Sequence, residues 1–224
     1  MPEISEGRYR GEFLFSEACG TRSMETVTLK QSAYLEAGTV LGCISKAAAT
    51  GAAVGGNAGT GTITASPTVA AGIKAGVYRA VCIEPGTDAG KFLVSDPDGI
   101  EVGVATVGVA FSGGGLTFTI ADGGTDFASG DSFTVTVATG SKKFVQFNQD
   151  ALDGSEVACA ILYDNVDAAS GDVEVAVVGR DAEVNGNEIT WPADIEDAEK
   201  TVAISQLAEY RVVAGTTFGG IIVR

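Results

Sequence analysis

The stretch that decides the fold is FVQFNQDALDGSEVACAILYDNVDA, residues 144–168. It holds two short apolar runs, 144–148 and 157–166, which a polar stretch containing Asp, Gly and Ser separates. Short runs rich in Val, Ile, Phe and Tyr and bounded by turn residues are typical of β-strands. A third run of this kind, DVEVAVVGRDAEV (172–184), ends at the turn sequence NGN (185–187). These residues predict a mainly β protein.

Segments on both sides extend the same domain. YLEAGTVLGCIS (34–45) has a glycine turn before a short apolar strand, and TTFGGIIVR (216–224) closes with another strand. Residues 194–209 are the one convincing helix, because Asp and Glu fill the first turn, where the helix dipole favours negative charge. The helix makes this domain α+β. Its expected inward stripe consists of Ala198, Val202 and Leu207.

The middle of the chain has a different composition. Residues 47–66 are nearly all Ala, Gly and Thr, which predicts a flexible connection. Strand-like runs with Gly and Asp turns then recur at a spacing of about ten residues, which favours a small antiparallel sandwich or barrel. The expected strands are 60–64, 76–83, 91–95, 101–111, 115–121 and 131–138. We therefore predict a domain formed by 33–46 plus 141–224 that is interrupted by an inserted antiparallel β-sandwich module, 47–140.

The N-terminal residues 1–32 are expected to form an extended arm. Nine charged residues alternate there with aromatic and aliphatic ones. Exposed aromatics on a charged arm are typical of a docking surface, although an N-terminal strand packed on its own domain is the alternative. The candidate binding residues are Arg8, Tyr9, Arg10, Phe13, Leu14 and Phe15.

Charge and composition exclude several classes of function. The chain has 224 residues, a formal charge of −15 and no histidine. Ser-His-Asp and Cys-His catalysis and His-ligated zinc or iron are therefore excluded. The acidity argues against nucleic acid and anionic membrane surfaces as partners. No apolar run approaches the roughly 20 residues of a membrane span, and residues 1–15 lack the pattern of a signal peptide.

No motif indicates a catalytic centre or a cofactor site. The glycine-rich residues 55–61 lack the Lys-Ser/Thr of a phosphate-binding loop, and no serine has the Gly-x-Ser-x-Gly context. The turn at Asp96 and Asp98 and the group Asp122, Asp126 and Asp131 could bind a metal, but ordinary turn chemistry explains them better. We therefore expect no enzyme, no metal and no cofactor.

The cysteines and the single tryptophan are expected to be structural. Trp191 is interpreted as a core anchor or a subunit contact. Each cysteine lies in an apolar or small-residue run without a CxxC pair, which favours buried free thiols over two disulfides. The four are Cys19, Cys43, Cys82 and Cys159.

Three segments together resemble a known family. LEAGTVLGCIS (35–45), FVQFNQDALDGSEVACAILYDNVDA (144–168) and VAVVGRDAEVNGNEITWP (175–192), followed by a short helix, are similar in order and spacing to phage head decoration proteins of the lambda type. The resemblance implies a homotrimer of mixed β structure on three-fold and quasi-three-fold positions of an expanded icosahedral shell. The arm would then contact the major capsid protein, and binding would stabilise the head against internal DNA pressure.

The resemblance also implies a place for the protein and leaves one rival function. A decoration protein is made in the host cytoplasm and lies on the outer surface of the virion, where acidity limits sticking. Residues 47–140 resemble a small β module that recurs in structural proteins of tailed phages. The rival function is a virion-surface module that binds a host glycan or protein on a structural scaffold. An acid-pair hydrolase ranks third.

Overall fold

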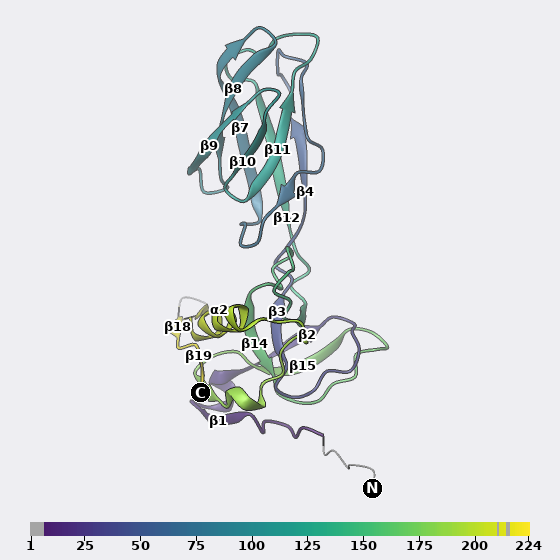
Figure 1. Ribbon diagram of the computed structural model, residues 1–224, viewed down its shortest axis with the longest axis vertical. Coiled ribbons are helices and arrows are strands. Elements are labelled where there is room, and N and C mark those ends of the chain that lie inside the picture. Colours follow the sequence, from purple (N-terminus) through teal and green to yellow (C-terminus); the bar gives the residue numbers. More distant parts are fainter. Residues whose placement is uncertain (1–6, 210, 214–215) are drawn as a thin grey trace. The chain divides into compact units, whose positions relative to one another are not determined.

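The computed structural model describes residues 7–209, 211–213 and 216–224, and residues 1–6 of the expected arm lie outside them. Strands far outnumber helices in this part of the chain, so the predicted mainly β class is confirmed (Figure 1). None of the described helices is long and apolar enough to cross a membrane.

The chain divides into two compact units. One consists of residues 1–44 and 142–224, and the other of residues 45–141. We call the first the flanking domain and the second the insertion. The junctions expected after residues 46 and 140 lie within two residues of those in the structure.

A closed five-stranded barrel, in the order β13-β2-β15-β14-β3, forms the centre of the flanking domain. Two of its strands precede the insertion and three follow it, so the barrel closes only when both segments fold together. The strands are β2 (Met24–Leu29), β3 (Val40–Cys43), β13 (Phe144–Gln146), β14 (Ala158–Leu162) and β15 (Val173–Val178).

Further sheets and helices complete the flanking domain. A three-stranded sheet has the order β1-β16-β19, and β17 pairs with β18 in a separate hairpin. These elements are β1 (Leu14–Glu17), β16 (Ala182–Val184), β17 (Arg211–Val213), β18 (Thr216–Phe218), β19 (Ile221–Val223), α1 (Gly20–Ser23), the 3₁₀ turn η1 (Gly186–Glu188) and α2 (Asp197–Ala208).

The helix α2 begins as its sequence predicts but buries a different face. The backbone N–H of Glu196 donates to the Glu199 carboxylate at 2.8 Å, one half of a capping box. Ala203 and Leu207, four residues apart, are the buried positions. The prediction was right for Leu207 and wrong for Ala198 and Val202, since Ala198 is exposed and Val202 is 57% exposed.

The insertion is a sandwich of two sheets. The larger sheet has the order β4-β12-β7-β8-β9, and the smaller has the order β10-β11-β5, with β6 also paired to β11. The buried face of the larger sheet carries an aromatic cluster that includes Phe92 on β8 and Phe133 on β12, with ring centroids 5.6 Å apart. The strands are β4 (Lys46–Ala53), β5 (Thr62–Ile63), β6 (Thr68–Val69), β7 (Gly76–Gly86), β8 (Ala89–Ser95), β9 (Glu101–Thr106), β10 (Ala110–Gly113), β11 (Leu116–Ala121) and β12 (Ser132–Thr139).

The prediction of a flexible connection over 47–66 was wrong. Most of its first half is β4, which pairs with β12 along its length. Small residues are required there, because a Cβ atom on Gly51 would lie 2.2 Å from the carbonyl oxygen of Thr64. The expected single strand 101–111 is likewise two strands, since Gly108 makes a turn at φ +77° between β9 and β10.

The prediction that residues 1–32 form a separate arm is corrected by the strand pairing. β1 pairs with β16, and β2 is a barrel strand that pairs with β15 along six residues. Phe13 and Leu29 of this segment are buried in core clusters of the flanking domain, and burial of such side chains favours docking onto it. This is the alternative of an N-terminal strand packed on its own domain.

Candidate functional site

The chain between residues 7 and 17 crosses the surface of the flanking domain through a glycine turn. Gly11 has φ +66°, and its N–H donates to the carbonyl oxygen of Tyr163 at 3.0 Å. A Cβ atom at this position would lie 2.8 Å from the Tyr163 ring. Glycine therefore allows the segment to lie directly against the tyrosine before it enters β1.

The two candidate arginines hold this segment on the domain. Arg8 forms ion pairs with Glu188 at 3.4 Å and Glu36 at 3.7 Å, and its side chain also donates to the Glu188 carbonyl oxygen. Arg10 pairs with Asp164 at 3.0 Å. Exposed pairs of this kind contribute little singly, but three of them along a short segment fix its path.

The aromatic candidates separate into buried and exposed side chains. Phe13 is 1% exposed and belongs to a core cluster, and Leu14 packs partly buried against the same cluster. Phe13 is therefore a core residue and is not available for docking, which corrects its assignment as a contact. Tyr9 and Phe15 are 59% and 60% exposed. Large exposed aromatics within one short segment are typical of an interaction surface.

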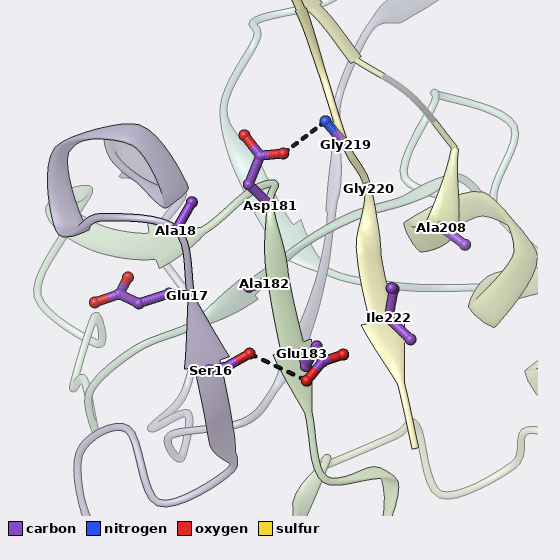
Figure 2. A pocket seen from close by; sticks show the side chains of 10 residues that line it. All are labelled: Ser16, Glu17, Ala18, Asp181, Ala182, Glu183, Ala208, Gly219, Gly220 and Ile222. Carbon is purple, nitrogen blue, oxygen red and sulfur yellow. Dashed lines mark hydrogen bonds between the residues drawn. The ribbon is translucent and has the colours of Figure 1, made fainter.

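A hollow of about 470 Å³ lies beside β1. Figure 2 shows its wall, in which β1, β16 and β19 contribute side by side. Small and apolar residues form part of it, and three carboxylates lie among its lining side chains. The lining residues are Ser16, Glu17, Ala18, Asp181, Ala182, Glu183, Ala208, Gly219, Gly220 and Ile222.

The carboxylates of this hollow all have partners within the chain. Asp181 accepts hydrogen bonds from Arg22 Nε at 3.0 Å and from the backbone N–H of Gly219 at 2.7 Å. Glu183 accepts from Ser16 Oγ at 3.1 Å and from Arg224 at 2.6 Å. Asp181 and Glu183 are therefore held in place by groups of the flanking domain.

Trp191 lies at a second hollow. Its ring packs edge-on against Phe147, with centroids 6.4 Å apart, and it is partly buried against the core. Together with Asn148 and Asp194 it lines an opening of about 490 Å³. The tryptophan thus contacts the core on one side and an accessible surface on the other.

The acidic turns are held by protein groups. Asp96 accepts backbone hydrogen bonds from Asp98 and Ile100, at 3.0 and 2.8 Å, and Lys74 forms ion pairs with Asp96 and Asp98. This is the ordinary turn chemistry of an Asp-Pro-Asp-Gly sequence.

Asp131 is also a structural carboxylate. It is 5% exposed and accepts the backbone N–H groups of Ala58, Gly59 and Ala128 at 2.8 to 3.0 Å. Burial raises the pKa of Asp131, but these three hydrogen bonds outweigh it and lower the pKa below its ordinary value. Asp131 therefore stabilises the fold of the insertion.

A second acidic group of the insertion consists of Asp88, Asp122 and Asp126, whose carboxylate oxygens lie within 4.8 Å of one another.

The structure joins none of the four described cysteines in a disulfide, and their burial differs. Cys82 is buried, Cys43 and Cys159 are partly buried, and Cys19 is exposed next to α1. A hydrogen bond from the Thr21 side chain lowers the pKa of Cys19.

Residues 3–212 match the family described as bacteriophage lambda head decoration protein D. The chain belongs to this decoration family. The match includes the barrel strands on both sides of the insertion and the insertion itself, and it ends before β18 and β19. The family is one of structural proteins of the phage head.

Other comparisons add no functional information about the decoration protein. No curated protein matches it. A crystal structure of Xanthomonas campestris FlgL is similar at 19% identity and a TM-score of 0.33, covering 46% of this chain and 33% of that one. The flagellar hook junction protein FlgK from Burkholderia pseudomallei is similar at 24% identity and a TM-score of 0.32, covering 56% and 21%. The chain thus spans a third or less of their lengths, and scores this low carry no argument.

Proposed function

We propose that this decoration protein binds the outer surface of the expanded icosahedral head as a homotrimer at three-fold and quasi-three-fold sites. Its binding stabilises the head against internal DNA pressure. The supporting observation is the family match across the split barrel domain. A ligand that binds only the expanded lattice stabilises that lattice by mass action, and three linked chains add avidity.

We assign the contact with the major capsid protein to the surface around Tyr9, Phe15 and β1. β1 is an edge strand of its sheet, so one side of its backbone is open to a further strand. Phe15 projects from β1, and the neighbouring hollow of Figure 2 offers room for a side chain of the partner. Arg10 lies on the same segment and is 66% exposed despite its ion pair.

The trimer contact is assigned to the surface at Trp191. Aromatic side chains that are half-packed on a core and open on the other side are common anchors of subunit interfaces. Acidic groups over the rest of the surface favour solubility and disfavour contact with DNA.

Binding to expanded, undecorated heads tests the capsid contact. Tyr9→Ala and Phe15→Ala should each weaken binding by about tenfold or more, because exposed aromatic anchors carry much of an interface's energy. Tyr34→Ala is the matched control, since Tyr34 is 56% exposed but lies outside the segment. Co-sedimentation of the protein with heads measures the affinity. If all three variants bind heads as well as the unchanged protein does, the assignment of the capsid contact to Tyr9 and Phe15 is wrong.

A further inference from the structure

The outer face of the larger insertion sheet carries a row of apolar side chains among polar and charged ones. The alternate residues of its strands that point away from the core include Val81, Leu93 and Val104. Val81 and Val104 are 37% and 44% exposed, and Leu93 is partly exposed. A sheet that covers a core with one face normally presents polar residues on the other. The apolar row across β7, β8 and β9 is therefore a local departure from that pattern.

The strand register arranges this face in rows centred on β8. Leu93 on β8 lies opposite Val81 on β7 and Val104 on β9. In the next row, Ser95 on β8 lies opposite Arg79 on β7 and Glu101 on β9. In the first row, a valine lies on each side of β8. In the second row, a cation lies on one side of β8 and an anion on the other.

The second row carries a cation and an anion that lie apart from each other. Neighbouring strands are about 4.8 Å apart, so Arg79 and Glu101 are separated by roughly 10 Å across Ser95. Neither side chain forms an ion pair with any residue of the described part of the chain. A partner that carries the opposite pattern would satisfy both.

We propose that this face pairs with the same face of a second copy of the chain around a two-fold axis along β8. A rotation about that axis exchanges the positions of β7 and β9. Arg79 then faces Glu101 of the second copy, and Val81 faces its Val104, while Leu93 and Ser95 meet their own counterparts. An isologous interface requires this self-complementarity, and the face supplies both its charges and its apolar residues from one surface.

The size of the face makes the contact a weak one in solution. With the axis along β8, β7 of one copy covers β9 of the other, so only these three strands of each sheet overlap. Three strands about 4.8 Å apart and seven residues long give roughly 330 Å² per copy, well below the ~800 Å² per partner of a standard interface. Lys91, which would approach its own counterpart at the end of the face, is already neutralised by Glu84 at 2.8 Å. Local concentration therefore decides whether the contact forms.

The symmetry also fixes where the contact would act on a head. A two-fold contact cannot be satisfied among the three chains of a trimer, so it would join chains of neighbouring trimers. This last step rests on the proposed decoration by trimers, whereas the pairing of the face does not.

Cross-linking of the full-length protein in solution tests the position of the axis. With the exposed Cys19 replaced by serine, Ser95→Cys should give a cross-linked dimer with a short bis-maleimide, because facing sheets pack about 10 Å apart. Val109→Cys is the matched control, since Val109 is 57% exposed in the turn between β9 and β10. Denaturing electrophoresis counts the covalently joined chains. Equal dimer yields from the two variants would overturn the proposal.

Charge reversal tests the pairing itself. Arg79→Glu and Glu101→Arg should each abolish the Ser95→Cys cross-link, because each places like charges opposite one another. The double variant restores opposite charges and should restore the cross-link. No loss in the single variants, or no recovery in the double variant, would contradict the proposed axis. These measurements use no phage heads, so their failure is distinct from a failure of capsid binding.

Discussion

The flanking domain and the insertion reach a buried β core by opposite routes. In the flanking domain, strands that are far apart in the sequence pair with each other. β2 pairs with β15, and Leu29 lies opposite Val173. In the insertion, β7 and β8 form a hairpin, and the core consists of insertion residues alone. A unit with its own core can be added at a surface turn without altering the barrel that receives it. The comparison teaches that the barrel depends on pairing between distant parts of the chain, whereas the insertion forms its core from its own residues.

The junction shows how the barrel tolerates this addition. Ile44 donates its N–H to the carbonyl oxygen of Lys143 at 3.0 Å, and Lys142 donates to the carbonyl oxygen of Ile44 at 2.9 Å. The two ends are therefore already paired like the ends of a hairpin. The insertion occupies the position of a β-turn.

The largest effect that separates the two regions is expected from a core truncation. Phe133 is 0% exposed, so Phe133→Ala should lower the stability of the insertion by about 3–5 kcal/mol. The single tryptophan, Trp191, lies in the flanking domain and reports only on that domain. Calorimetry should show an earlier insertion transition while the midpoint of Trp191 fluorescence does not change.

The matched truncation in the barrel should do the reverse. Leu162 is 0% exposed, and Leu162→Ala should move the tryptophan midpoint and leave the insertion transition in place. If either variant moves both transitions equally, the two regions unfold as one unit.

A smaller and pH-dependent effect is expected from Asp131→Asn in the insertion. Loss of the charged acceptor for three backbone N–H groups should lower stability at pH 7 by about 2 kcal/mol. Because the folded pKa is lowered, this stabilisation is present above the unfolded value, roughly pH 4, and is lost as pH falls through the folded value. The difference from the unchanged protein should therefore vanish in strong acid.

Asp88→Asn is the control for this effect, because Asp88 is exposed in the same module. Thermal unfolding followed between pH 2 and pH 7 measures both variants. A deficit of Asp131→Asn that persists unchanged to the lowest pH would contradict the role given to its carboxylate.

The smallest effect is expected from Val202→Ala on helix α2 of the flanking domain, where Leu207→Ala serves as the buried counterpart. Val202→Ala should change stability by no more than about 0.5 kcal/mol, because the side chain is on the solvent face. Leu207→Ala should lower stability by about 2–5 kcal/mol, because Leu207 is 4% exposed. Chemical denaturation followed by Trp191 fluorescence compares them. Comparable losses would show that the helix packs on another face.

Much of the fold follows from local patterns in the sequence. Phe133, Val135 and Val137 alternate with threonines, and all three are buried in β12 as the alternation predicts. Residues 47–66 could not be assigned correctly in this way, because alanine, glycine and threonine give no hydrophobic signal. Their strand is imposed by main-chain pairing with β12 and by the close approach at Gly51.

The candidate site was predictable only in part for the same reason. The composition around Tyr9 and Phe15 identifies a surface segment, but it does not distinguish them from Phe13, which the fold buries. The hollow beside β1 joins Ser16 with Glu183 and Ile222, which no local pattern links. Pairing of distant strands creates this surface, so only the folded chain reveals it.

The most direct test of the central claim is to remove the insertion and measure binding to expanded, undecorated heads. Residues 45–141 would be replaced by Asn-Gly, which suits a two-residue hairpin between the paired ends at Ile44 and Lys142. The account predicts a folded flanking domain, shown by unchanged Trp191 fluorescence, that binds heads at the same stoichiometry as the full chain. A folded domain that no longer binds heads would contradict it and would assign capsid binding to the insertion.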